Sequence, residues 1–238
     1  MKFPLFKKCG RLLTRSVRLP IISGPNRHLM WSLSTRTSFL RGSYESSLTR
    51  FTQSVVNAGD TFWDIGAHFG YYTLLGSRAV GDAGHVYCFE PSTSNLWYLN
   101  HHIAWNQLQN VSVQPFAIGG CVGERLFGGD CGTGGGELDR GNQQVHVETI
   151  DSLVISARCR PPTFIKMDVQ GAETEVLRGG VQTLQSNPMV LQVATHGDQI
   201  HGNCLSILKG YGFRVWDYPQ RRIIIAATPT CSLQAVNL

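Results

Sequence analysis

Three acidic residues of this 238-residue chain lie in or at the end of short apolar runs, and a histidine follows another such run. Asp64 lies just before a glycine turn, whereas Glu90, Asp168 and His196 come where later runs end. Such runs predict buried parallel strands, and the carboxyl ends of parallel strands meet at one edge of a sheet, where ligands bind. Carboxylates accept hydrogen bonds and an imidazole can act as a general base. We therefore expect a binding site with acid–base chemistry at this edge.

The segment 61–92 has the pattern strand, glycine turn, helix, strand, with the spacing Asp64-x-Gly66-x-x-x-Gly70. The G-x-G-x-x-G pattern that lets a pyrophosphate approach the backbone is missing, which disfavours an NAD-dependent dehydrogenase. An acid in the turn suits a ligand with an amino group and a sulfonium, such as S-adenosylmethionine. Glu90 could then hold both ribose hydroxyls. Alternatively, Glu90 is a surface acid at a strand end and the glycines only turn the chain.

Other polar and small residues complete the expected site. Asn95 lies one turn into the helix expected after Pro91, and it either contacts the cofactor or faces solvent. Ala117 follows the third strand, where an adenine could stack. For the general base, His196 has a more suitable intrinsic pKa than Asp168, although His196 could equally be a hydrogen-bonded structural histidine.

The elements that must position these residues alternate between strands and helices along the chain. This pattern predicts a nucleotide-binding α/β sheet that ends in an antiparallel hairpin. The expected strands are 61–65, 85–90, 111–116, 163–169, 188–194, 213–218 and 222–228, with a further extended run at 145–150 and a short strand at 19–23. The expected helices are 44–57, 71–80, 92–106, 172–178 and 199–209, with a short helix from Asp151.

Two regions lack this regular pattern. Residues 27–42 mix apolar residues with Ser, Thr and Arg and predict no firm element. Residues 119–141 hold ten glycines, which excludes a stable helix. We expect a loose hairpin or flap over 119–142, within a domain that spans 44–238.

Charge is unevenly distributed: residues 1–50 hold ten Lys or Arg and one acid, although the net charge of the whole chain is only +5. Residues 1–43 therefore form a basic extension and lead-in, which is either a solvated terminus or a contact for an anionic membrane surface or nucleic acid. The lead-in to the first strand could also pack over the nucleotide site or help shape a substrate pocket. No aromatic–basic pattern of an RNA reader occurs, so no nucleic-acid partner is expected. No secretory signal or spanning segment is apparent.

Cysteine usage favours a reducing compartment. The chain has seven cysteines, an odd number, and no C-x-x-C pair, which suits free thiols in the cytoplasm better than disulfides or structural zinc. The spacing of His196, His201 and Cys204 matches no standard zinc pattern. We expect a cytoplasmic protein, peripheral to a membrane if the basic segment docks on one, and no metal.

Three blocks of the sequence resemble the FkbM family of S-adenosylmethionine-dependent methyltransferases, over about residues 44–228. The blocks are Asp64-Ile65-Gly66-Ala67-His68-Phe69-Gly70-Tyr71-Tyr72-Thr73, Phe89-Glu90-Pro91-Ser92 and Ile165-Lys166-Met167-Asp168-Val169-Gln170-Gly171-Ala172-Glu173. The chain departs from the family pattern at His68, where Asn is usual, at Gln170, where Glu is usual, and before His196, where Glu is often found.

The resemblance implies a Rossmann-like class I methyltransferase fold with a seven-stranded, mostly parallel sheet, and methyl transfer to a hydroxyl of a sugar, glycolipid or other natural product. It places the methionine end of S-adenosylmethionine at Asp64, Gly66 and Gly70, the ribose at Glu90, and the transfer centre beside Asp168. A non-catalytic module that binds this cofactor, with a basic N-terminus that binds membrane or nucleic acid, is the alternative. The expected cofactor contacts are Asp64, Gly66, Ala67, His68, Gly70, Tyr71, Glu90, Pro91, Asn95, Ala117 and Asp168, and the expected catalytic residues are His196 and Asp168.

Overall fold

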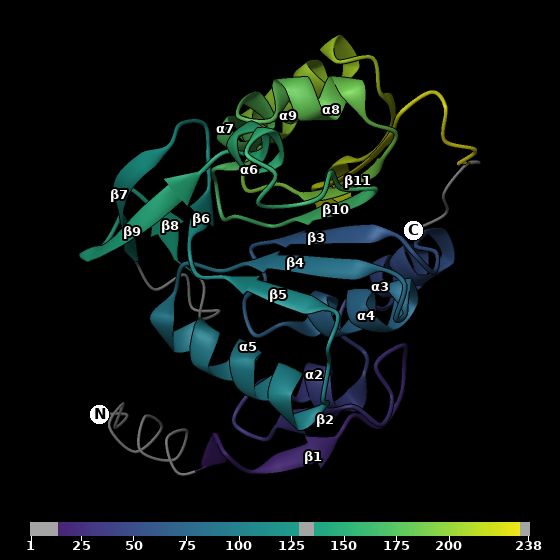
Figure 1. Ribbon diagram of the computed structural model, residues 1–238, viewed down its shortest axis with the longest axis vertical. Coiled ribbons are helices and arrows are strands. Elements are labelled where there is room, and N and C mark those ends of the chain that lie inside the picture. Colours follow the sequence, from purple (N-terminus) through teal and green to yellow (C-terminus); the bar gives the residue numbers. More distant parts are fainter. Residues whose placement is uncertain (1–13, 129–135, 234–238) are drawn as a thin grey trace.

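A seven-stranded sheet forms the centre of the computed structural model, which describes residues 14–128 and 136–233 (Figure 1). The strand order is β12-β13-β11-β10-β3-β4-β5, and only β13 runs against the others. The expected mostly parallel sheet with a C-terminal hairpin is thereby confirmed. The strands are β3 Thr61–Ile65, β4 His85–Phe89, β5 Val111–Gln114, β10 Phe164–Met167, β11 Val190–Ala194, β12 Arg214–Tyr218 and β13 Ile223–Ala227, with the 3-10 turn η1 Pro219–Arg221 between the last two.

Helices cover both faces of this sheet, as the apolar runs of its strands require. Figure 1 shows α6 to α9 above the sheet and α3 to α5 below it. The upper helices are α6 Ile150–Ile155, α7 Glu173–Arg178, α8 Val181–Ser186 and α9 Asp198–Gly210, and the lower ones are α3 Ser46–Val55, α4 Tyr71–Val80 and α5 Thr93–Trp105. Each face has its own buried apolar cluster, which includes Trp63 and Leu191 on one side and Phe62 and Ile225 on the other. The part of the chain that the structure describes has no helix long and apolar enough to cross a membrane.

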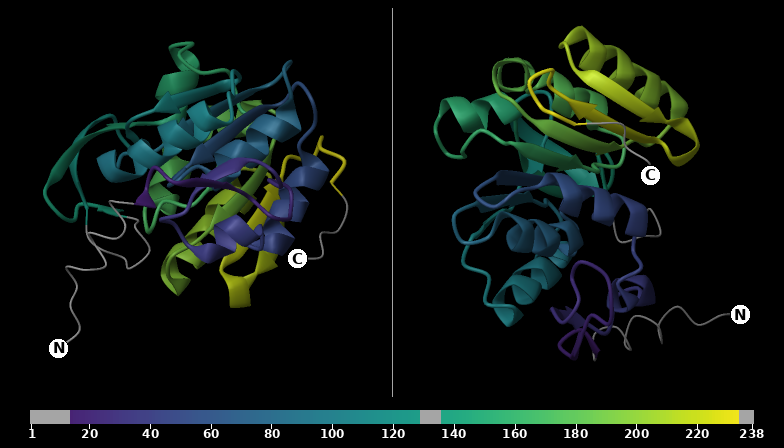
Figure 2. Two further views of the ribbon diagram at one scale, coloured as in Figure 1. Left: turned by 90° about the horizontal axis from the view of Figure 1, so that it is seen from below. Right: turned by 90° about the vertical axis from the view of Figure 1, so that its right-hand side faces the viewer.

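An N-terminal layer packs against α4 and α5 on the side away from the sheet (Figure 2). It consists of β1 Arg18–Pro20, β2 Met30–Ser32 and α2 Thr37–Arg41, so the segment 27–42, for which no firm element was expected, holds a strand and a helix. The Trp31 ring is fully buried and stacks on His102 of α5, with 3.7 Å between ring centroids. Because Trp31 and Phe39 share a buried cluster with Tyr71 and Leu74, this layer belongs to the core of the molecule.

The glycine-rich region forms part of a second, four-stranded sheet of order β6-β9-β7-β8. Its strands are β6 Ala117–Ile118, β7 Gly123–Gly128, β8 Glu137–Leu138 and β9 Gln143–Glu148. The expected hairpin is present as the antiparallel pair β7 and β8, although residues 129–135 of the expected flap lie outside the described residues. The extended run expected to reach Ile150 ends earlier, because Thr149 caps α6 by accepting a hydrogen bond from the Ser152 backbone N–H at 2.9 Å.

Candidate active site

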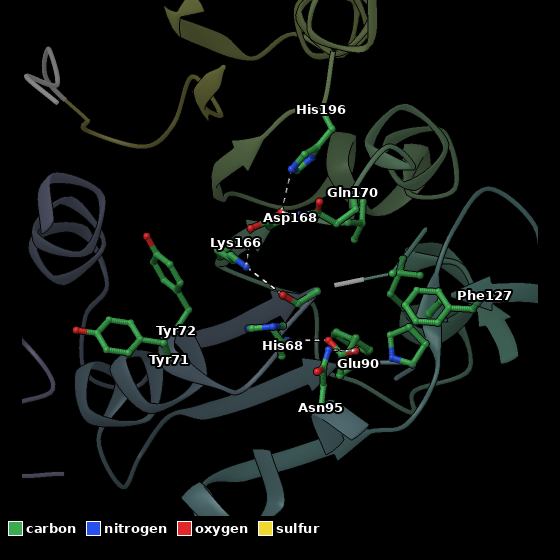
Figure 3. A pocket seen from close by; sticks show the side chains of 18 of the residues that line it. His68, Tyr71, Tyr72, Glu90, Asn95, Phe127, Lys166, Asp168, Gln170 and His196 are labelled. Atoms are coloured by element: carbon green, nitrogen blue, oxygen red, sulfur yellow. Dashed lines mark hydrogen bonds and ion pairs between the residues drawn. The ribbon is translucent and has the colours of Figure 1, made fainter. Parts of the chain in front are cut away.

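A cavity of about 270 Å³ opens at the carboxyl ends of β3, β4 and β10 (Figure 3). Glu90 and Asn95 lie at one end of the view, Asp168 and His196 at the other, and Phe127 of the second sheet closes one side. Nine of the eleven residues expected to bind the cofactor line this cavity, as do both expected catalytic residues. The nine are Gly66, Ala67, His68, Tyr71, Glu90, Pro91, Asn95, Ala117 and Asp168.

Asp64 and Gly70, expected at the methionine end of the cofactor, do not line the cavity. Asp64 is fully buried beneath the turn and accepts a hydrogen bond from the Thr73 hydroxyl at 2.7 Å. Gly70 begins α4 with φ +91°, and a Cβ there would lie 2.6 Å from a methyl carbon of Leu99. Both residues therefore support the turn from behind, because the strand alternates its side chains and the helix start faces the core.

Gly66 brings two strand ends into contact. Its φ of +80° favours glycine, and a Cβ at this position would lie 1.9 Å from the carbonyl oxygen of Asp168. The backbone N–H groups of Gly66 and Ala67 both donate to the Phe89 carbonyl, at 3.0 Å each. The glycine thus lets the ends of β3, β4 and β10 converge around one ligand-sized space.

Glu90 is almost fully buried, with 4% of its surface exposed, and is held by three donors. It accepts hydrogen bonds from the backbone N–H of His68 at 2.7 Å and of Ser92 at 2.9 Å, and from Asn95 Nδ2 at 3.2 Å. Burial raises the pKa of Glu90, while these donors act in the opposite direction. A carboxylate offers about four lone-pair positions, so one remains, on Oε2. Glu90 was expected to hold both ribose hydroxyls, but the structure leaves it one free acceptor position, which suits one hydroxyl.

Lys166 is a buried cation of the site that was not singled out from the sequence. Its Nζ donates to the Gly66 carbonyl at 3.1 Å and lies 3.6 Å from Asp64 Oδ1 and 3.8 Å from Asp168 Oδ2. Burial alone would lower the pKa of Lys166, but the surrounding carboxylates raise it, so the ammonium stays charged. A lysine in the apolar run of β10, two residues before Asp168 on the same strand face, was the available signal.

His196 is the half-buried imidazole at the other end of the cavity, and two carboxylates hold it. Its Nδ1 lies 2.7 Å from Glu173 Oε1, and its Nε2 lies 3.6 Å from Asp168 Oδ1. Glu173 is fully buried and also accepts from the Gly171 backbone N–H at 3.2 Å. Burial lowers the pKa of His196, but the hydrogen bond to Glu173 and the charges of both acids raise it overall. Nδ1–H therefore donates to Glu173, which leaves Nε2 toward the cavity to take a proton.

The N-terminal layer and the start of α3 supply the remaining wall. Phe39, Tyr44 and Tyr71 form an aromatic cluster whose ring centroids are 4.5 to 5.5 Å apart. Glu45, with φ +44°, accepts a hydrogen bond from the Tyr72 hydroxyl at 2.8 Å. Burial, with Glu45 nearby, raises the pKa of Tyr44. Periodicity could not place Phe39 in this wall, because Phe39 comes from the segment 27–42, which has no recognisable pattern.

The arrangement suits a cationic nucleoside ligand. At the nucleoside end, Glu90 keeps one acceptor position on Oε2. At the other end, the carboxylates of Glu45 and Asp168 line the cavity together with the Lys166 ammonium, and Glu173 contacts His196. A sulfonium and an amino group would be stabilised there, and the residues present therefore fit S-adenosylmethionine.

A metal centre has no support in residues 14–128 and 136–233, where no group of three His, Cys, Asp or Glu could hold an ion. His201 instead lies 2.7 Å from both the Thr195 hydroxyl and Asp217 Oδ1. Cys204 is fully buried beside Thr174. These side chains are structural partners of α9.

Comparisons with known proteins agree with this geometry. A family profile described as the methyltransferase FkbM domain matches residues 64–215. The methyltransferase FkbM of Methylobacillus flagellatus KT superposes with a TM-score of 0.53 at 17% identity, covering 79% of this chain and 52% of the other. The chain thus spans about half the length of that protein. No curated protein sequence matches it.

Two further solved structures share the fold. A putative rRNA methylase of Clostridium thermocellum has a TM-score of 0.52 at 14% identity, with 76% of this chain and 93% of the other covered. A precorrin-6y C5,15-methyltransferase of Geobacter metallireducens GS-15 has a TM-score of 0.51 at 14% identity, with 77% and 88% covered. Since the family profile spans well over half of the sequence, the chain belongs to the FkbM methyltransferase family, whose cofactor is S-adenosylmethionine.

Proposed function

We propose that this protein transfers the methyl group of S-adenosylmethionine to a hydroxyl oxygen of a small-molecule or glycan acceptor. The observation that carries the proposal is the contact of His196 with Glu173 and Asp168 beside the glycine turn. A neutral aliphatic hydroxyl is a poor nucleophile, so a base within reach of it is the feature that O-methylation needs most. The cofactor supplies the electrophilic methyl group when bound.

In this proposal the ribose lies at Glu90 and the methionine end lies over Gly66, toward Asp168. Ala117 lies beside Phe127 of the second sheet, in the part of the cavity that we assign to the adenine. Lys166 neutralises part of the charge of Asp64 and Asp168 and keeps both side chains in place. The excess of carboxylates then favours the sulfonium over neutral analogues.

His196 takes the proton of the acceptor hydroxyl at Nε2, and Glu173 holds the imidazole through Nδ1 so that Nε2 is the free nitrogen. Glu173 also stabilises the charge that the imidazole gains. The protein's remaining contribution is to align the hydroxyl and exclude water. The aromatic cluster of Phe39, Tyr44 and Tyr71 gives the acceptor half of the cavity an aromatic wall of mutually tilted rings, which suits a sugar or another cyclic natural product.

The test is transfer of a labelled methyl group to a panel of hydroxylated acceptors, with each variant also assayed for cofactor binding. We expect His196→Ala to lower kcat by about 100-fold or more, the usual range for a general base, without weakening cofactor binding. His146→Ala is the matched control, because His146 also contacts two carboxylates but does not line the cavity. Unchanged kcat in His196→Ala would refute the role of this residue.

The alternative, a module that binds the cofactor without turning over, predicts affinity for S-adenosylmethionine but no labelled product with any acceptor. A cytoplasmic location is part of our proposal, since Cys88, Cys159 and Cys204 are buried free thiols.

A further inference from the structure

A second hollow, of about 470 Å³, lies between residues 24–28 and the helices α3 and α4, and it shares no lining residue with the active-site cavity. We call it the basic groove. Its lining includes Arg27, Arg50, Arg78 and His28 but no acidic residue. The groove therefore concentrates positive charge at a place that the methyl-transfer site does not use.

The three guanidinium groups come from separate elements and are all exposed. Among the described residues, none of the three forms an ion pair with a carboxylate. Arg78 Nη1 donates to the Arg27 carbonyl oxygen at 2.9 Å, which holds the loop against α4. Like charges that share a hollow repel one another, and an anion with several oxygens relieves this repulsion by accepting from more than one arginine. The groove thus favours a phosphate-bearing ligand.

Exposed aliphatic side chains accompany the groove. Ile22 has 70% of its surface exposed and lies two residues before Gly24 of the groove wall. Val17, Leu19 and Leu33 of the same layer are 41 to 44% exposed, so four of the eight large exposed apolar side chains in the described chain fall within residues 17–33. An exposed aliphatic side chain such as Ile22, next in the chain to a groove whose arginines have no carboxylate partner among the described residues, is typical of a surface that contacts lipid.

The N-terminal layer and the helix that follows it are almost entirely positive in charge. Residues 14–59 contain six arginines and a single acid, Glu45, which faces the active-site cavity. A nucleic acid would also match this charge, but proteins that bind single strands stack bases on aromatic side chains, and the exposed apolar residues here are aliphatic. A soluble phosphate compound would leave Ile22 without a role.

We propose that the N-terminal layer docks on an anionic lipid surface, with a headgroup phosphate in the basic groove and Ile22 inserted at the headgroup level. The same layer supplies Phe39 to the active-site cavity, so docking would engage an element that also shapes that cavity. This inference does not depend on which acceptor is methylated.

The experiment is co-sedimentation of the full chain with vesicles of phosphatidylcholine alone or mixed with phosphatidylglycerol. We expect binding to the anionic vesicles only, with weaker binding as salt rises. Arg50→Gln and Arg78→Gln should each weaken binding about fivefold, which corresponds to the roughly 1 kcal/mol expected per basic residue near such a surface. Arg50 has no hydrogen bond to the groove loop, so its variant keeps the test valid if Arg78→Gln loosens the fold.

Two matched control variants replace an exposed cation and an exposed apolar side chain that lie outside the N-terminal layer and the basic groove. Lys209→Gln removes an exposed cation of α9, and Ile155→Ser removes an apolar side chain that is 65% exposed. Neither should change vesicle binding, whereas Ile22→Ser should weaken it about tenfold or more, the loss expected when an aliphatic side chain no longer leaves water.

Three outcomes would overturn the proposal. One is equal binding to neutral and anionic vesicles, and another is binding that the groove variants leave unchanged. The third is loss of binding in the arginine variants but not in Ile22→Ser, accompanied by tight binding of a homopolymeric RNA or of inorganic phosphate, because the groove would then serve a soluble polyanion and not a membrane.

Discussion

Replacing Glu90 by Gln tests the assignment of the nucleoside end of the cavity. The substitution preserves the shape of the side chain but removes its charge and one of its two acceptor oxygens. Since the amide oxygen can face only one side, it would pair with Ser92 and Asn95 or with His68, and at least one of these donors would lose its partner. The fold should become less stable by about 1–3 kcal/mol, the usual cost of an unpaired buried donor.

The effect on cofactor affinity follows from the single lone pair left on Oε2. A hydrogen bond to a charged group contributes about 1.5–3 kcal/mol, so its loss should weaken binding of S-adenosylmethionine roughly 10- to 150-fold. Titration calorimetry measures this affinity, and thermal denaturation measures the stability of each variant. Glu148→Gln is the matched control, because Glu148 is 6% exposed and hydrogen-bonded but lies outside the cavity. It should lower stability without changing affinity.

Deoxy analogues make the test specific to one hydroxyl. S-adenosylhomocysteine that lacks the 2′- or the 3′-hydroxyl is titrated against the wild-type protein and Glu90→Gln, which gives a double-mutant cycle for each hydroxyl. The analogue that lacks the hydroxyl bound by Glu90 should bind the wild-type protein more weakly than the full ligand does, and Glu90→Gln should not weaken its binding further. The affinity of the other analogue should still fall in Glu90→Gln. Sensitivity to Glu90→Gln that is the same for both analogues and for the full ligand would refute a ribose contact, as would an affinity change below twofold.

Three other predictions concern the base, the turn and the N-terminal layer. Because Glu173 raises the pKa of His196, the rising limb of the kcat–pH profile should move to lower pH in Glu173→Gln, and an unmoved limb would exclude His196 as the group that titrates. Gly66→Ala should lose more than about 2 kcal/mol in urea denaturation, unlike Gly59→Ala, where φ is also positive but no atom lies near the new Cβ. Burial lowers the pKa of His102 from 6.5 to about 3. As the pH falls below 6.5, His102 is therefore protonated in the unfolded state but not in the folded state, and the free energy of unfolding should fall by up to about 1.4 kcal/mol per pH unit. A free energy of unfolding that does not change with pH, and whose pH dependence His102→Gln does not alter, would contradict this.

The main sheet and most of the cavity could be predicted because their signals are local. Each strand carries its own apolar run, and chemistry at strand ends can be located from the strands alone. Glu90, Asp168 and His196 were found in this way, and all three line one cavity. Asp64 and Gly70 belong to the same motif but do not line the cavity, because they pack against Thr73 of α4 and Leu99 of α5.

The parts that were missed depend on contacts between distant segments. Lys166 becomes part of the site only because β10 pairs with β3 in a register that sets it opposite Asp64. Glu173 matters because the loop after β11 brings His196 back to α7. The strand β2 and the helix α2 are short, and tertiary packing stabilises them more than their own sequence does.

The contact of the N-terminal layer with α5 also has a consequence for the order of synthesis. The Met30 backbone pairs with the Asn106 side chain, 76 residues later in the chain. At the usual elongation rate of about 5–20 residues per second, Met30 is added to the chain roughly 4 to 15 s before Asn106. During this interval the Trp31 ring, which is fully buried in the finished protein, lacks part of its packing surface, the α5 side that includes the His102 ring on which it stacks. The N-terminal layer is therefore completed only after α5 has been made, and until then it stays open to chaperones and proteases.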